Sequence, residues 1–224
     1  MLKLSDRMNR ILDMCESFDV WADIGCDHGI ISAELVLRSK AKKVIASDIS
    51  EASLFKAQGY ALSMGISDKV VCRLGNGFGV LAPKEADGAI LSGMGTPLII
   101  TIISQNRRVS ENLKSMVISA NNYPDRLRKW LTNNGFHIQE EQIVKDAGRF
   151  YPIMKAKKGD CIPYSEKELL LGRNILVDDS FKQYVDWLIL RESNIISQMR
   201  LGGNDPKKHV KIKEIFEEVK NDRC

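Results

Sequence analysis

The chain has 224 residues with a formal net charge of +4, and 44% of its residues are hydrophobic while 28% are charged. This length and composition fit one α/β domain with a substantial core and a smaller appendage. The slight positive charge permits an anionic partner without requiring one. The five cysteines form no CxxC pair, which argues against both a zinc site and a disulfide framework.

The sequence carries no pattern of secretion or membrane insertion. Residues 1–15 have charges every few positions and lack the continuous apolar stretch of a signal peptide. No run of about 18 apolar residues occurs anywhere in the sequence. Together with the scattered cysteines, these features favour a protein of the reducing cytoplasm with no membrane contact.

The first 160 residues alternate between helical and strand-like patterns of apolar residues. We expect helices at 4–17, 29–39, 51–64, 97–106 and 124–134. We expect strands at 20–24, 42–48, 69–78, 86–95, 115–120, 136–146 and 149–159. The alternation implies right-handed crossovers and a mainly parallel, Rossmann-like sheet. The last two strands leave no room for a helix between them, so an antiparallel hairpin should end this seven-stranded sheet.

The remainder of the sequence is helical. The segment "SEKE" at 165–168 has the pattern of a capping box. Apolar positions recur at helical spacing over 181–199 and again over 212–219, and the breaker segment 201–206 separates them. We therefore expect an antiparallel helical hairpin, and we divide the chain into a Rossmann-like domain, 1–160, and a helical domain, 161–224.

The stretch "VWADIGCDHGIISAEL" joins the first strand to a helix through a turn that suits a ligand. Gly25 and Gly29 let the backbone turn tightly and approach a bound molecule. Asp48, which ends the second strand, is placed to hold a ribose diol. Asp27 stands where the dinucleotide fingerprint GxGxxG has its middle glycine, and a carboxylate there would repel a pyrophosphate. The pattern therefore disfavours NAD and favours a cationic, phosphate-free nucleoside, S-adenosylmethionine.

Two further glycine turns follow later strands. In "GNGF", Asn76 could face an adenine edge, and "LSGMGTP" ends the fourth strand, where a methyl-transferring sheet usually places its chemistry. Two simpler interpretations stay open: the glycines could serve only as tight turns, and Asp27 could cap the helix that follows it.

The segments "LSDRMNRILDM", "WADIGCDHGIIS", "ASDIS", "LSGMG", "LRKWLTNNGF" and "GRFYPIMKAKKGD", followed by "ELLLG" and a helical tail, resemble one enzyme family in this order. The chain is similar to the bacterial tRNA adenine-N1-methyltransferases that modify adenosine 22. The resemblance implies a class I methyltransferase fold with a C-terminal coiled-coil-like hairpin. It also implies S-adenosylmethionine as methyl donor and tRNA as acceptor.

The turns and the resemblance together define a candidate site. We predict that Asp27 is catalytic, as a carboxylate beside the adenine amino group, and that Asn121 and Tyr151 hold the base by hydrogen bonding and stacking. The predicted cofactor-binding residues are Asp23, Gly25, Cys26, His28, Gly29, Asp48, Ile49, Asn76, Gly77, Gly93, Met94 and Gly95.

The chain also departs from the family pattern at several positions. Asn76 replaces an acid, Thr96 replaces a glycine at a point where the backbone passes close to the target base, and Pro152 replaces an acid after Tyr151. Two alternatives therefore stay open. The protein could methylate a small molecule or a protein on the same fold, or it could be a cofactor-binding adaptor without activity.

Binding of tRNA requires basic side chains along its backbone. Basic residues follow the fourth and fifth strands and the hairpin, and we expect most of them to lie on solvated faces. They are Arg107, Arg108, Arg126, Arg128, Lys129, Lys155, Lys157 and Lys158. The cluster that we favour as a clasp for tRNA lies on the helical tail and comprises Lys207, Lys208, Lys211 and Lys213. We expect the protein to be a monomer.

Overall fold

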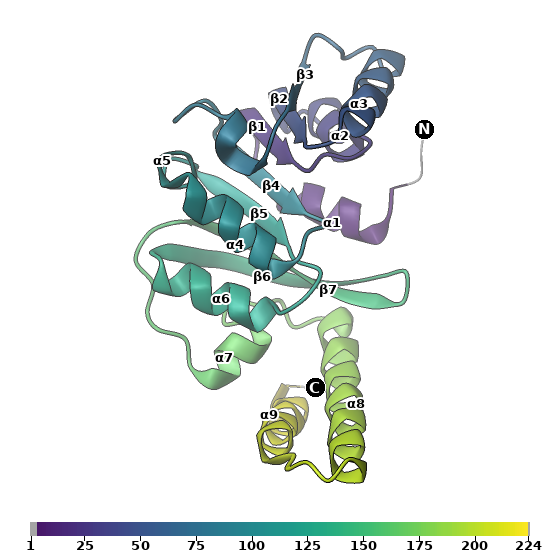
Figure 1. The fold of residues 1–224 in the computed structure, drawn as a ribbon, viewed down its shortest axis with the longest axis vertical. Coiled ribbons are helices and arrows are strands. Elements are labelled where there is room, and N and C mark those ends of the chain that lie inside the picture. The colour runs from purple at the N-terminus through teal and green to yellow at the C-terminus, as the bar shows by residue number, and fades with distance from the viewer. Residues whose placement is uncertain (1–3, 224) are drawn as a thin grey trace.

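The structure, a computed structural model, describes residues 4–223. A twisted sheet runs through the N-terminal part of the chain with helices on both faces, and two long helices extend from one end (Figure 1). The strands are β1 Phe18–Ile24, β2 Ala41–Asp48, β3 Val70–Leu74, β4 Gly88–Ser92, β5 Ser115–Ser119, β6 Phe136–Asp146 and β7 Arg149–Lys158. The helices are α1 Asp6–Met14, α2 Ile30–Leu37, α3 Glu51–Ser63, the 3₁₀-helix η1 Gly77–Val80, α4 Thr96–Gln105, α5 Arg107–Ser110, α6 Pro124–Asn133, α7 Glu166–Leu171, α8 Asp179–Leu201 and α9 Lys207–Arg223.

The sheet has seven strands in the order β3-β2-β1-β4-β5-β7-β6. The first five strands of this order pair in parallel, and β7 runs antiparallel to both β5 and β6. The expected parallel sheet with a terminal hairpin is therefore confirmed. The third strand ends earlier than expected, at Leu74, because the glycines that follow it turn the chain into η1. The short helix α5 was not anticipated.

Two layers of helices bury the two faces of the sheet (Figure 1). Helices α1, α2 and α3 pack on one face, where Trp21, Leu12 and Leu35 are fully buried. Helices α4 and α6 pack on the other face, with Ile103 and Leu127 in the core. Strands covered on both sides read as continuous apolar runs, which explains the sequence pattern of β1 and β4.

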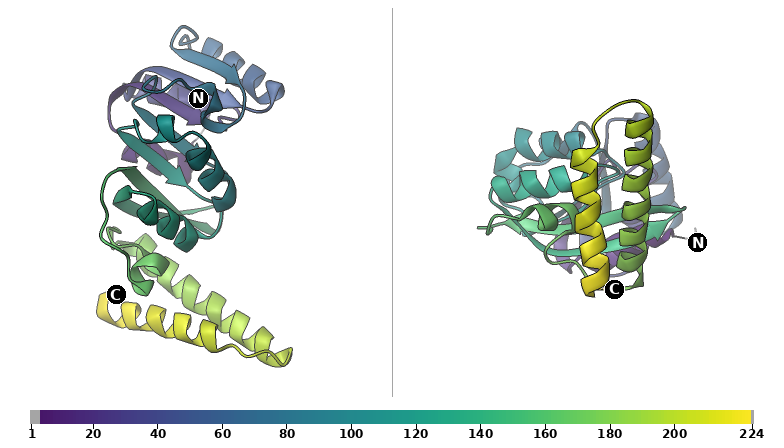
Figure 2. Two further views of the ribbon diagram at one scale, coloured as in Figure 1. Left: turned by 60° about the vertical axis from the view of Figure 1, so that its left-hand side comes forward. Right: turned by 90° about the horizontal axis from the view of Figure 1, so that it is seen from below.

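The C-terminal helices α8 and α9 lie side by side and antiparallel, as both views of Figure 2 show. Phe181, Leu188 and Phe216 form a third apolar cluster, to which Ile143 of β6 also belongs. Ser165 and Glu168 make the expected capping box at the start of α7. The helical hairpin is thus confirmed and packs on the edge strand of the sheet. Within residues 4–223, no helix combines the length and apolarity that crossing a membrane requires.

A buried ion pair joins the sheet to α7. The Arg128 guanidinium donates from Nε to the Glu141 carboxylate at 2.9 Å and from Nη1 to the carbonyl oxygens of Leu169 and Leu170, at 2.8 and 3.0 Å. Both charged side chains are 0% exposed. Arg128 is therefore an exception to the expected solvated faces, because a buried carboxylate balances its charge and the last carbonyls of α7 accept from Nη1, while Nη2 is buried without a hydrogen-bond partner among the described residues.

The Glu141 carboxylate also explains why glycine occupies position 172. Gly172, the residue after α7, has a positive φ of 93°, and a Cβ there would lie within 1.8 Å of Glu141 Oε2. Glu141 also binds the chain beyond α7 through its backbone, which exchanges hydrogen bonds with Asn174 and Leu176. One residue of β6 thus fixes the path by which the chain enters the helical arm.

We expect the substitution Arg128→Ala to lower the free energy of unfolding by about 3–5 kcal/mol, because it leaves a buried carboxylate unpaired. Urea denaturation followed by circular dichroism measures the change. The double variant Arg128→Met with Glu141→Leu should recover most of the loss, since neither charge then remains buried. A loss below about 1 kcal/mol in the single variant would contradict this account of the pair.

Candidate functional site

A cavity of about 450 Å³ opens at the edge where the parallel strands β1 and β4 end. Its volume lies within the usual range of small-ligand sites. The residues that line it come from α1, the β1–α2 turn, the start of α2, the end of β4 and the tip of the β6–β7 hairpin. They are Ser5, Arg7, Met8, Ile11, Asp23, Gly25, Cys26, Asp27, His28, Ile30, Ile31, Ser92, Gly93 and Asp146.

The β1–α2 turn is built from left-handed backbone. Gly25, Asp27 and Gly29 all have positive φ, at 74°, 47° and 69°. A Cβ on Gly29 would lie 2.6 Å from the Cβ of Ala57, so α2 can begin this close to α3 only with glycine. Gly29 is itself the N-cap of α2, and no side chain caps that helix. The interpretation of Asp27 as a helix cap is therefore wrong.

The end of β2 holds this turn in place. Asp48 accepts the backbone N–H of Asp27 at 3.1 Å through one carboxylate oxygen and that of Ser50 at 2.9 Å through the other. The carbonyl of Ser47 accepts the N–H groups of Gly25 and Cys26. Each Asp48 oxygen keeps a further lone pair, so the carboxylate can still accept hydroxyl groups of a ligand.

The polar side chains of Asp27 and His28 in the turn are exposed and contribute little to the stability of the fold. The Asp27 carboxylate is 73% exposed, and its one charged contact is with His28, whose Nε2 lies 3.4 Å from Asp27 Oδ1. Exposed pairs of this kind add little to stability. Both residues line the cavity, and their side chains are therefore available to a ligand.

An acid also lies on the floor of the cavity. Asp23 is 4% exposed, and the Ser32 hydroxyl donates to its Oδ2 at 2.6 Å. Burial raises the pKa of Asp23 to about 6, although the hydrogen bonds from Ser32 act to lower it. A buried carboxylate that is ionised at neutral pH gives this end of the cavity a preference for a positively charged group.

The turns after β4 and β5 are tied together. Asn121 donates from Nδ2 to the Gly93 carbonyl at 2.7 Å, and its backbone N–H donates to Met94 at 2.9 Å. Thr96 is 1% exposed, and its hydroxyl donates to the carbonyl of Asn122 at 2.6 Å. The Thr96 side chain is therefore buried and holds the β5 turn against the β4 turn, while the closeness of its backbone to the target base stays a prediction.

Arg7 of α1 connects the predicted acceptor residues Asn121 and Tyr151, and no sequence pattern indicated this role. Its guanidinium donates to Ser119 Oγ at 3.0 Å, to the Ser119 carbonyl at 2.7 Å and to Asn121 Oδ1 at 3.0 Å. Its Cζ also lies 4.0 Å from the centre of the Tyr151 ring. The periodicity of α1 predicts an amphipathic helix, but it does not show which polar residue faces the sheet edge. The hairpin residue Asp146 was also missed, because the alternation of a strand does not show that the tip of the hairpin reaches the cavity.

The predicted cofactor residues divide into two groups. Asp23, Gly25, Cys26, His28 and Gly93 line the cavity, while Gly29 and Asp48 shape its walls. Asn76 instead lines a separate hollow of about 570 Å³ beyond β3, and Ile49 is 76% exposed beyond β2. Gly77 is buried against Ile102 at the start of η1, and Met94 and Gly95 lie in the β4 turn. For this second group, contact with a cofactor stays a prediction.

The donor and acceptor groups of the cavity fit a cationic nucleoside. Asp23 supplies negative charge, Asp48 supplies acceptors for a diol, and Arg7 and His28 can face a carboxylate. The left-handed Gly93 leaves open space beside the backbone, since no described atom lies within 4 Å of a Cβ built on it. S-adenosylmethionine combines these features, since it carries a sulfonium, an amino acid and a ribose but no phosphate.

The fold and this cavity define a Rossmann-like enzyme whose ligand lies beyond the carboxyl ends of the strands. Residues 4–154 match the family described as "Methyltransferase domain", and the chain therefore belongs to that family. The tRNA (adenine(22)-N(1))-methyltransferase of Bacillus subtilis (strain 168) is 28% identical over 159 residues, which is 71% of this chain and 67% of the relative.

Solved structures share the whole architecture. Streptococcus pneumoniae Sp1610 in complex with S-adenosyl-L-methionine has a TM-score of 0.88 at 25% identity, over 97% of this chain and 100% of that chain. The m1A22 tRNA methyltransferase TrmK of B. subtilis has a TM-score of 0.84 at 23% identity, over 98% and 100% of the two chains. The similarity therefore extends over the C-terminal helices as well as the sheet.

We expect Asp23→Asn to remove a pH dependence of stability. The native pKa of Asp23, about 6, lies above the ordinary value of 3.8, so the folded state holds this proton more tightly than the unfolded chain. Protonated Asp23 therefore stabilises the wild-type protein at low pH. This contribution, up to about 3 kcal/mol, is lost as the pH rises from 3.8 to about 6.

Urea denaturation of both proteins at pH 4.5 and pH 7.5 tests this expectation. The stability of Asp23→Asn relative to wild type should increase at the higher pH, whatever constant offset the substitution introduces. A difference between the two proteins that does not change with pH would show that Asp23 titrates normally.

Proposed function

We propose that this protein transfers a methyl group from S-adenosylmethionine to N1 of adenosine 22 in tRNA. The observation that carries the proposal is the acid-lined cavity at the carboxyl edge of a methyltransferase sheet, where Asp27 is held by its backbone and its side chain is exposed. The name of the B. subtilis relative supports the acceptor, and the bound ligand of Sp1610 supports the donor. As a tRNA-modifying enzyme, the protein would act in the cytoplasm, as a monomer.

The methyl donor would be held by residues already in place. Asp48 would accept the ribose hydroxyls, Asp23 would face the positively charged end, and Arg7 and His28 would face the carboxylate. When bound, S-adenosylmethionine supplies an electrophilic methyl group on a sulfonium. Because the turn residues are fixed by Ser47 and Asp48, the cavity is ordered before any ligand arrives, which favours catalysis by positioning.

The acceptor nitrogen needs little activation. Adenine N1 carries an in-plane lone pair, so attack requires no prior loss of a proton. Methylation leaves the ring cationic and makes its amino group more acidic. A carboxylate beside that edge stabilises the charge and can accept a proton, and Asp27 is the exposed carboxylate of the cavity turn that can approach it.

Asn121 and Tyr151 support this arrangement by position. Asn121 uses one amide hydrogen on Gly93 and one lone pair on Arg7, so one donor and one acceptor remain for the base. Tyr151 has one ring face under the Arg7 guanidinium and packs partly against the core. We infer that both residues shape the acceptor wall, with Asn121 nearer to a direct contact.

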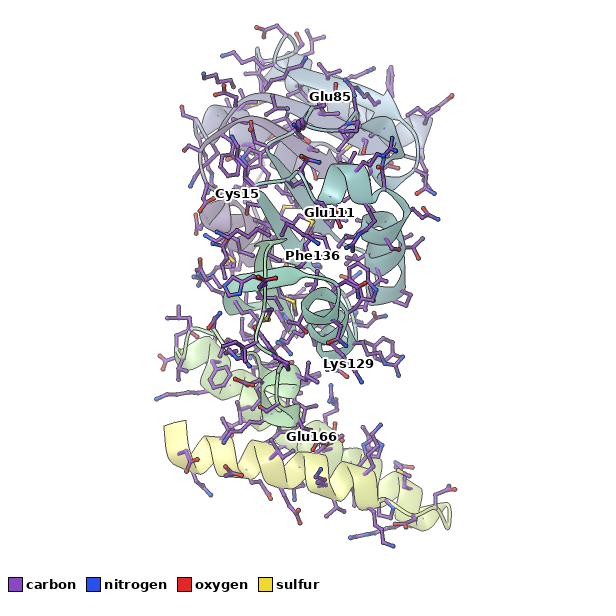
Figure 3. The ribbon with its side chains drawn as sticks, turned by 90° about the vertical axis from the view of Figure 1, so that its left-hand side faces the viewer. Cys15, Glu85, Glu111, Lys129, Phe136 and Glu166 are labelled. Atoms are coloured by element: carbon purple, nitrogen blue, oxygen red, sulfur yellow. The ribbon has the colours of Figure 1, made fainter. Side chains whose placement is uncertain are left out.

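The tail lysines are less free than their sequence suggests. Lys207 lies 3.4 Å from Asp205 and Lys213 lies 3.2 Å from Glu217. Lys211 pairs with Glu166, which Figure 3 shows where α7 meets α9. These acids offset much of the positive charge, so a clasp on tRNA would have to displace them. The role of the tail in tRNA binding stays a prediction.

The decisive experiment incubates the purified protein with unmodified tRNA and labelled S-adenosylmethionine, followed by nucleoside analysis. We expect 1-methyladenosine as the product and its loss when adenosine 22 is replaced by guanosine. Label in a protein or a small molecule, with none in tRNA, would favour another methyltransferase of the same fold. Cofactor binding without any acceptor would favour an inactive adaptor.

We expect Asp27→Asn to lower kcat by about 10²–10³-fold while it changes the affinity for S-adenosylmethionine by less than about threefold. The reason is that the amide keeps the shape of the side chain but cannot accept a proton. Isothermal titration calorimetry and single-turnover kinetics measure the two quantities. If affinity falls together with kcat, Asp27 acts on cofactor binding rather than on the acceptor.

A further inference from the structure

An exposed tyrosine with unfavourable backbone geometry lies next to the acceptor wall of the cavity. Tyr123 follows Asn121 and Asn122 in the turn after β5, and its φ of 47° is in the left-handed region. Bulky residues rarely occupy that region, and they persist there only where their surroundings impose it. The side chain is 50% exposed, and its hydroxyl has no hydrogen-bond partner among residues 4–223.

Several hydrogen bonds impose this geometry. The Tyr123 carbonyl accepts the hydroxyl of buried Thr96 at 3.2 Å and the backbone N–H groups of Arg126 and Leu127 in the first turn of α6. The same Thr96 hydroxyl holds the carbonyl of Asn122, and the Asn122 amide accepts the backbone N–H of Thr96. The fold thus fixes the backbone of Tyr123 although the ring contributes to none of the three apolar clusters.

The ring is paired with a guanidinium. The Cζ of Arg126 lies 4.4 Å from the centre of the Tyr123 ring. An exposed aromatic ring beside an arginine is the combination on which unstacked RNA bases are commonly held. Tyr151 also lies under a guanidinium, that of Arg7, but it is less suitable because its ring packs partly against the core.

We propose that Tyr123, backed by Arg126, is the platform on which a nucleobase adjoining the target adenine stacks. Tyr123 does not line the cavity, but it lies two residues from Asn121, whose amide binds the cavity residue Gly93. A base next to an extruded adenine loses its stacking partner, and a ring at the rim replaces that partner. This inference rests on the proposed function, because it requires tRNA as the acceptor.

The substitution Tyr123→Gly separates this role from a structural one. Glycine adopts a positive φ without strain, so the variant should keep or raise the melting temperature of the protein. It should nevertheless lower kcat/KM for tRNA by about 10-fold or more, since stacking of one base on an aromatic residue contributes about 5–150-fold in affinity. Its affinity for S-adenosylmethionine should equal that of wild type.

Two further variants serve as controls. Tyr123→Phe keeps the ring and should retain kcat/KM for tRNA within about twofold, because stacking does not need the hydroxyl. Phe55→Ala removes another exposed ring, which is 77% exposed on α3, and should leave tRNA methylation unchanged. The set thus tests whether an aromatic ring at position 123, rather than any exposed ring, supports the reaction.

The outcomes distinguish the two proposals. If wild type methylates tRNA and Tyr123→Gly does so equally well, the platform is wrong and the proposed function stands. If Tyr123→Gly loses both thermal stability and activity, the ring is structural and the platform is again wrong. If wild type methylates no tRNA, both proposals fail.

Discussion

One carboxylate, that of Asp48, holds the loop on which the candidate site depends. The parallel sheet ends with backbone N–H groups that have no strand partner, and such groups must be satisfied locally. Asp48 satisfies those of Asp27 and Ser50 with its two oxygens. Because the backbone of Asp27 is held in this way, its side chain is not needed for the turn and remains available for chemistry. The N-cap of α2 is Gly29 and not an acid, because α3 leaves no room there for a Cβ.

The opposite wall of the cavity is held by a different set of contacts. Asn121 binds the β4 turn, and Arg7 binds Asn121, Ser119 and the face of Tyr151. These contacts come from α1, β5 and β7, so the wall exists only in the complete sheet. Groups fixed by several elements lose little entropy when a substrate binds, which is the physical basis of preorganised catalysis.

The sequence allowed the alternation of strands and helices, the antiparallel ending and the helical hairpin to be predicted, because periodicity and glycine turns are local signals. It also placed Asp23, Asp27 and Asp48 at one edge, since parallel strands end together. It could not reveal Arg7, whose partner Ser119 is 112 residues away. Nor could it show that Arg128 is buried, because the periodicity of an amphipathic helix does not reveal that this arginine pairs with the Glu141 carboxylate of β6. The structural role of the Thr96 hydroxyl was not evident for a similar reason, since its partners lie in the turn after β5.

The position of Arg7 has a consequence for how the protein is made. During translation α1 emerges from the ribosome before the sheet that follows it, and the residues that the Arg7 guanidinium binds are synthesised more than a hundred residues later. The first helix must therefore wait, undocked on that side, until β5 and the final hairpin have joined the sheet. The wall formed by Arg7, Asn121 and Tyr151 is consequently among the last parts of the sheet domain to form, and a nascent chain that lacks β7 does not yet have it.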